Sequence, residues 1–145
     1  MSLVIDIADA VTAELNAAPP GTFTPSFTAM RRVLPEFDLA DLADLKVSVV
    51  PKRVEITGST RSASQYEIAV DIGIQKKLGK DLDSEVAALS TLVDQIADYL
   101  RRRPLGAAPF ASWVSISNEP VYAPEYLAEQ RVFTSVLTVS YRALK

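Results

Sequence analysis

The sequence contains no cysteine and no histidine. Without cysteine the chain has no disulfide, no thiolate metal site and no thiol nucleophile, and this composition suits a reducing compartment. Without histidine it lacks the usual general base near neutral pH and the commonest metal ligand. These two absences remove the most frequent kinds of catalytic centre, so we expect a protein that is not an enzyme and that uses no cofactor.

Long apolar runs and a strong excess of one charge are also lacking. No stretch approaches the roughly 18 apolar residues that cross a bilayer. The N-terminal segment has no basic region and carries Asp6, Asp9 and Glu14, which is unlike a signal peptide. The net charge of -3 gives no overall attraction to nucleic acid or to an anionic membrane. We therefore expect no membrane association, and synthesis and folding in the cytoplasm.

The chain has 145 residues, of which 48% are hydrophobic. That length is usual for one domain, and the apolar fraction is sufficient for a core without metals or cross-links. The sequence shows no internal repeat and no low-complexity linker. It therefore predicts a single domain over residues 1–145.

Two segments have the apolar spacing of amphipathic helices. Residues 3–17 begin after Ser2, a possible cap, and end at a Pro-Pro-Gly sequence. Residues 83–102 begin at Asp83 or Ser84 as a cap, with further acids at the positive end of the helix, and end before Pro104. The stripe expected to be buried in the second helix comprises Val86, Leu89, Val93, Ile96 and Leu100.

Alternating apolar and polar residues predict several strands. Pro25 places the first at an edge or a bulge, and apolar residues on both faces of the last predict a central strand or one covered by a neighbouring subunit. The expected strands are 22–33, 46–50 and 53–57 separated by Pro51, 66–76, 113–116 and 131–141. Because helices and strands do not alternate regularly, we expect an α+β fold: a mostly antiparallel mixed sheet with two main helices packed on one face.

The segment 35–45 repeats an aspartate–leucine pair at Asp38, Asp41 and Asp44. Leucines three residues apart favour a short 3₁₀ or α turn that closes one edge of the core. The alternative is a divalent-cation site built from the three carboxylates. That alternative is weaker because the spacing lacks the glycine and the distal glutamate of a calcium-binding loop.

The polar stretch 58–65, which includes Arg61, lies between two expected strands. It reads as a mobile hairpin tip. Its serines and Arg61 also suggest a phosphate-binding loop, but the stretch has one glycine and no lysine of the Walker type. We therefore favour the hairpin tip.

Arg101, Arg102 and Arg103 lie at the negative end of the second helix, where cations are stabilising. Their alternative is a contact with phosphate or with an acidic partner. Trp113 is expected in the core or at an interface, and its alternative is stacking on a nucleic-acid base. Tyr122 and Tyr126 occur in an irregular stretch and are expected to be exposed.

Two long stretches resemble a known class of protein. They are YEIAVDIGIQKKLGKDLDSEVAALSTLVDQIADYL, from Tyr66, and PVYAPEYLAEQRVFTSVLTVSY, from Pro120. They are similar to the small neck and tail-completion proteins of long-tailed bacteriophages and prophages, with the tail terminator as the closest type. The resemblance follows the order of elements over the whole chain and is strongest over 66–100 and 119–141.

The resemblance implies a virion protein, assembled in the host cytoplasm and located at the tail neck. It implies a homo-oligomer, a hexameric ring whose channel passes DNA without sequence-specific binding. One face of the ring would meet the tail tube protein, and the other would meet a head-completion protein. It implies contacts in 58–65 and 104–128, so that Arg61, Trp113, Tyr122 and Tyr126 are candidate contact residues. The three aspartates and three arginines named above are candidates for charge-paired subunit interfaces.

Other functions stay open at this point. The chain could be another head–tail connector, such as an adaptor. It could also be a small carboxylate enzyme with a divalent metal at Asp38, Asp41 and Asp44. A nucleic-acid-binding module using Arg101–Arg103 and Trp113 is a further alternative, but it conflicts with the acidic pI of about 5.0.

Overall fold

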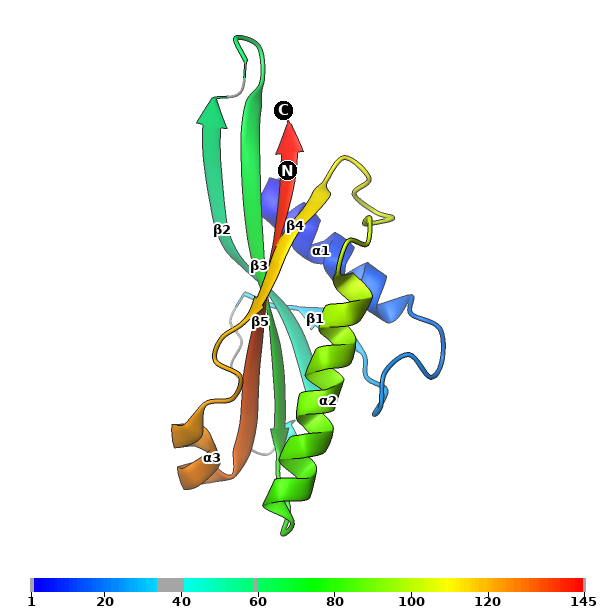
Figure 1. Ribbon diagram of the computed structural model, residues 1–145, viewed down its shortest axis with the longest axis vertical. Coiled ribbons are helices and arrows are strands. Elements are labelled where there is room, and N and C mark those ends of the chain that lie inside the picture. The colour runs from blue at the N-terminus through cyan, green and yellow to red at the C-terminus, as the bar shows by residue number, and fades with distance from the viewer. Residues whose placement is uncertain (1, 34–40, 59, 145) are drawn as a thin grey trace.

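The computed structural model describes residues 2–33, 41–58 and 60–144. Its described residues form a five-stranded mixed sheet in the order β1-β2-β3-β5-β4. Helices α1 and α2 pack on one face of this sheet and share one apolar core with it (Figure 1). The expected α+β fold, with a mostly antiparallel sheet and two main helices on one face, is therefore confirmed.

Helix α1 (Leu3–Asn16) matches the expected segment and buries an apolar stripe against the sheet. Ser2 occupies the N-cap position, but its side chain makes no capping hydrogen bond. At the other end, the Asn16 amide accepts from the Ala29 N–H at 2.8 Å and donates to the Ala29 carbonyl at 3.0 Å. These two bonds hold the short strand β1 (Ala29–Arg31) against the end of α1.

The expected strand over 22–33 is mostly wrong, because only β1 is formed there. Three prolines precede it at 19, 20 and 25, and proline supplies no N–H to a ladder. The expected position of this strand at the sheet edge is confirmed, because β1 is the first strand of the sheet and, among the described strands, pairs only with β2, in parallel.

Strands β2 (Lys46–Gly58) and β3 (Ser64–Lys77) form a long antiparallel hairpin. The expectation of two strands separated by Pro51 is wrong, because β2 is continuous. A register shift between Pro51 and Arg53 accommodates the proline, and a bulge is one of the places where a strand tolerates this residue. The expected hairpin tip lies between these two strands.

The 3₁₀ helix η1 (Asp41–Ala43) lies against β3 and buries Leu42. Leu42, Val50, Ala69 and Val132 are buried but are not part of the core beneath the helices. The last three alternate with residues that face α1 and α2, so they belong to the opposite face of the sheet. The predicted 3₁₀ turn is confirmed over η1, whereas Asp38 lies outside the described residues.

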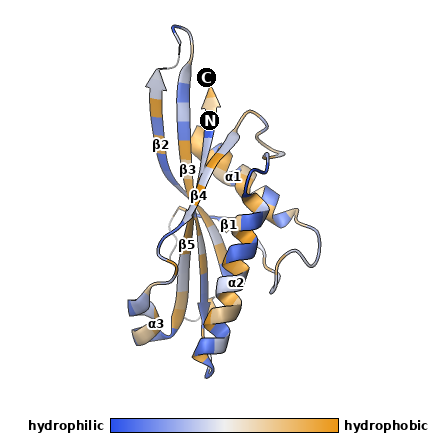
Figure 2. Cartoon of the chain, in the orientation of Figure 1, coloured by the Kyte–Doolittle hydropathy of each residue, from blue (hydrophilic) through white to orange (hydrophobic). Residues whose placement is uncertain are grey.

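Helix α2 (Leu82–Leu100) has its N-cap two residues before the first of the two caps that the sequence suggested. The N-cap is Asp81, whose carboxylate accepts from the Ser84 N–H at 3.3 Å, and not Asp83 or Ser84. Val86 is half-buried, and Leu92 takes its place in the stripe. The buried residues are Leu89, Leu92, Val93, Ile96 and Leu100, and Figure 2 shows the apolar and polar sides of this helix.

Strands β4 (Ser112–Asn118) and β5 (Val132–Leu144) complete the sheet, and β5 lies between β3 and β4. The expectation of a central final strand is thereby confirmed. Along the chain, β4 and β5 are connected through helix α3 (Pro124–Gln130), which the sequence analysis did not predict. Its first residue is Pro124, and it ends at Arg131, which has a left-handed backbone with φ of 54°. None of the described helices is long and apolar enough to cross a membrane.

Candidate functional site

The far end of the β2–β3 hairpin extends beyond the body of the molecule (Figure 1). In β2, every residue from Lys52 to Gly58 is exposed. We call this part of the hairpin, residues 52–58 and 60–67, the arm. It contains the expected 58–65 tip, and Arg61 is exposed there.

The arm has one apolar and one polar face. Val54 pairs with Ile68 and Ile56 pairs with Tyr66, so both lie on the face that carries the helix-side core. They are nevertheless 39% and 57% exposed, because no described helix covers this part of the hairpin. Arg53 and Glu55 alternate with them and lie on the opposite, polar face.

Along the arm, the outer edge of β2 is not paired with any strand of the described residues. Strand β1 pairs with β2 only from Val47 to Val49. Beyond Val49, no strand in the part of the chain that the structure describes lies on this side. A free edge of this kind presents unpaired backbone groups on which another strand can be added.

A second exposed apolar surface lies at the opposite end of the molecule, where α3 is found in Figure 1. Val121, Tyr122 and Tyr126 are 55%, 39% and 50% exposed, and we call them the α3 patch. The ring of Tyr122 lies 6.4 Å from that of Phe133 in the core, which fixes its position. Both candidate tyrosines are therefore exposed, one just before α3 and the other within it.

Asn118 holds the chain that leads into the α3 patch. Its amide donates to the Val136 carbonyl at 2.8 Å and to the Ser135 hydroxyl at 2.9 Å. The backbone of Glu119 also donates to Val136 at 3.0 Å. The segment before α3 is therefore attached to β5, although it is not part of a strand.

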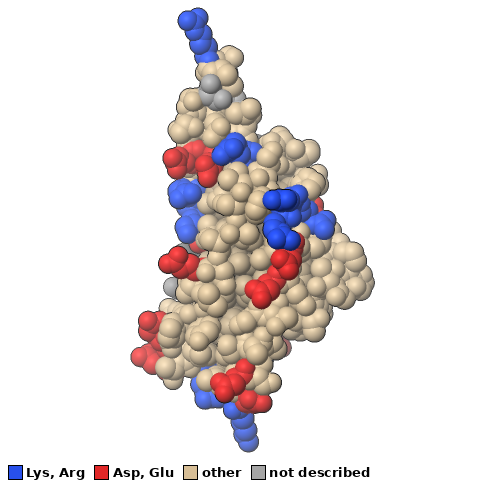
Figure 3. Space-filling view, viewed as in Figure 1, with Lys and Arg blue, Asp and Glu red and all other residues tan. Residues whose placement is uncertain are grey.

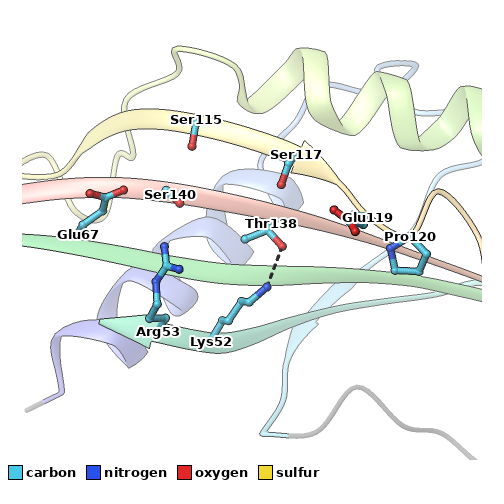
Figure 4. A pocket seen from close by; sticks show the side chains of 9 residues that line it. All are labelled: Lys52, Arg53, Glu67, Ser115, Ser117, Glu119, Pro120, Thr138 and Ser140. Carbon is cyan, nitrogen blue, oxygen red and sulfur yellow. Dashed lines mark hydrogen bonds between the residues drawn. The ribbon is translucent and has the colours of Figure 1, made fainter. Parts of the chain in front are cut away.

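A polar hollow of about 620 Å³ lies on the sheet face opposite the helices (Figure 4). Lys52 donates to the Thr138 hydroxyl at 3.4 Å, and Thr138 donates to the Asp71 carboxylate at 2.6 Å. Charges of both signs and several hydroxyls surround the hollow, so it can accept hydrogen-bonding groups. Its lining residues are Lys52, Arg53, Glu67, Ser115, Ser117, Glu119, Pro120, Thr138 and Ser140.

The hypothesis of a metal site depends on Asp38, which lies outside the described residues. Asp44 is exposed just after η1. Within residues 2–33, 41–58 and 60–144, no group of three metal-binding side chains is close enough to hold an ion.

The three arginines at the end of α2 are in different environments. Arg103 donates to the Tyr99 carbonyl at 2.8 Å, stacks on the Tyr99 ring at 3.9 Å, and lies 3.8 Å from the Glu14 carboxylate. Arg101 and Arg102 are exposed. Arg103 therefore ties α1 to the end of α2 while its side chain stays 41% exposed, and its two neighbours present their charge to solvent.

Trp113 is half-buried and packs against the helix-side core. Its indole N–H is buried and has no hydrogen-bond partner in the described part of the structure. The same is true of the hydroxyl of Tyr141, the residue opposite it on β5. Burial, with a smaller contribution from the charge of Glu14, raises the pKa of Tyr141 well above its usual range. Trp113 thus contributes to the core, as expected, with part of its side chain still exposed.

Neither known protein families nor characterised proteins gave a match to this sequence. Sequence reasoning named Arg61, Tyr122 and Tyr126 but missed Val54, Ile56 and Val121. The alternation of Val54 and Ile56 with charged residues was visible, but it is typical of any half-buried strand.

Proposed function

We propose that this chain is a ring-forming structural subunit of a phage or prophage tail, of the tail terminator type, which caps the tail tube and joins it to the head. The observation that carries the proposal is the arm. It extends away from the helices, and no described element covers its apolar face or pairs with its outer strand edge. The resemblance of residues 66–100 and 119–141 to tail-completion proteins supplies the biological setting.

The arm favours association with another protein chain on physical grounds. Burial of the exposed parts of Val54 and Ile56 would contribute about 1 kcal/mol each. Addition of a strand to the free edge of β2 would satisfy backbone groups at the same time. A monomer gains neither of these contributions, whereas an assembled ring gains both.

The test is mass photometry and negative-stain electron microscopy of the purified chain. The expected particle is a ring with a central channel and six times the chain mass of 15.8 kDa. Added to tail tubes of the parent phage, the rings are expected at one end of each tube. A protein that stays monomeric at every concentration and binds no tube would refute the proposal. Rings that bind heads and not tubes would assign the chain to another connector of the neck.

A further inference from the structure

We propose that the ring closes by a head-to-tail contact in which the arm of one copy binds the α3 patch of the next copy. This inference rests on the proposed function, because it names the partner of the arm as a second copy of this chain. The contact would place Val54 and Ile56 of one copy against Tyr122 and Tyr126 of its neighbour.

The positions of the two surfaces are the first argument. The arm and α3 lie at opposite ends of the long axis of the molecule (Figure 1). One chain therefore cannot bring its own arm to its own α3 patch. A contact between two different patches is heterologous, and its repetition leads to a closed ring or to a filament.

The chemistry of the two surfaces is the second argument. The arm offers aliphatic side chains, and the α3 patch offers two tyrosines and Val121. Tyrosines are favoured at interfaces because a large apolar ring is combined with a hydroxyl that stays hydrated. The tyrosines of the patch occupy one short helix and the chain before it, so they can receive a narrow two-stranded arm.

Charge distinguishes the head-to-tail contact from contacts between like surfaces. Residues 119–130 contain Glu119, Glu125 and Glu129 and no lysine or arginine. The turn of the arm carries Arg61, and no ion pair within the described residues involves it. Figure 3 shows a basic side chain beyond the end of the hairpin and acidic side chains over the region of α3. Two α3 patches would repel each other, whereas the tip of the arm and the patch attract.

The main alternative is a two-fold contact in which the free edges of two β2 strands pair with each other. That contact would bury the same arm but would leave the α3 patch exposed. It would produce a dimer with a closed symmetry and not a ring. The two contacts are distinguished by which residues become neighbours.

The absence of cysteine from the chain makes a cross-linking experiment specific. We would prepare Ile56→Cys and Tyr126→Cys, both at exposed positions, and treat them with a short bismaleimide. A mixture of the two single variants is expected to give a covalent dimer that neither variant gives alone. The double variant is expected to give a ladder of bands that ends at the closed ring.

Val33→Cys serves as the matched control, because Val33 is 75% exposed and belongs to neither surface. Mixed with Ile56→Cys, it is expected to give no dimer. A strong dimer from Ile56→Cys alone would overturn the inference in favour of two-fold arm pairing. The inference would also be overturned if the unaltered protein forms rings but the mixture of Ile56→Cys and Tyr126→Cys gives no covalent dimer.

Charge reversal gives an independent measurement. Arg61→Glu is expected to raise the concentration at which rings dissociate by about fivefold, the size of one exposed ion pair. Addition of Glu125→Arg and Glu129→Arg is expected to restore the original value. If Arg61→Glu weakens the rings and the two added substitutions do not restore the original dissociation concentration, the pairing of these charges is contradicted. Rings that show this contact but bind no tail tube would remove the proposed function and leave the contact standing.

Discussion

Tyr141 provides a sharp test of how the core is built. Its side chain is completely buried, and its hydroxyl has no hydrogen-bond partner among the residues that the structure describes. A buried polar group without a partner costs about 1–3 kcal/mol. Tyr141→Phe removes the hydroxyl and keeps the ring, so we expect the free energy of unfolding to rise by about 1 kcal/mol. We take the low end because phenylalanine leaves a small gap.

The same substitution has a predicted pH dependence. Burial raises the pKa of Tyr141 in the folded protein, whereas in the unfolded chain it titrates at about 10. Below that value both states are protonated, and the group adds nothing to the pH dependence. Above it the unfolded chain releases the proton first, so this tyrosine lowers stability by about 1.4 kcal/mol per pH unit until the folded state also titrates. The Tyr141→Phe variant lacks this loss.

Urea unfolding followed by tryptophan fluorescence is the suitable assay. Trp113 is the single tryptophan and lies opposite Tyr141 on β4. We expect the variant to be more stable at neutral pH and its advantage to grow as the pH rises above about 10. Tyr126→Phe, at a half-exposed position, is the control and should leave the free energy of unfolding at neutral pH unchanged. A variant less stable than the parent at neutral pH would show that the hydroxyl is hydrogen-bonded, and an advantage independent of pH would refute the raised pKa.

Three further predictions follow from single contacts. Asp81→Ala is expected to lower the free energy of unfolding by about 1 kcal/mol because it removes the N-cap of α2, whereas Asp83→Ala should cost a few tenths of that in the same urea titration. Asn16→Ala should cost about 2 kcal/mol and speed amide exchange in β1, because the amide makes two bonds to Ala29. Lys52→Ala should change stability by less than about 1 kcal/mol, because its ion pair spans 3.6 Å and its side chain is 46% exposed.

The parts of the fold that the sequence predicted well are those in which burial sets the spacing of apolar residues. The sequence of β3 shows strict alternation, and its inward residues from Ile68 to Ile74 are completely buried. The stripe of α2 was predicted for the same reason, and the central position of β5 was predicted from apolar residues on both of its faces. In each case cover by neighbouring elements sets the pattern, so the sequence pattern and the structure have one cause.

The parts that the sequence did not predict lack such a cause. None of the residues of α3 is buried, so no apolar stripe exists to indicate a helix there. Only Pro124 at its first position is a start signal, and the sequence reading took it as a sign of irregular structure. At Pro51 a local rule indicated a break, but a register shift and the long pairing with β3 overrode it.

The arm follows from the lengths of the elements in the structure, whereas the sequence suggested two short strands on either side of Pro51 and so gave no sign of it. Helix α1 has 14 residues and is about 21 Å long, whereas β2 has 13 residues and spans about 43 Å. In any orientation the helix leaves about half of the strand uncovered. The apolar alternation nevertheless continues to Ile56, beyond the reach of α1. A strand that keeps an apolar face where the described part of its own chain supplies no cover is suited to cover from another chain. This mismatch of lengths is the physical basis for our proposal that the arm takes part in assembly.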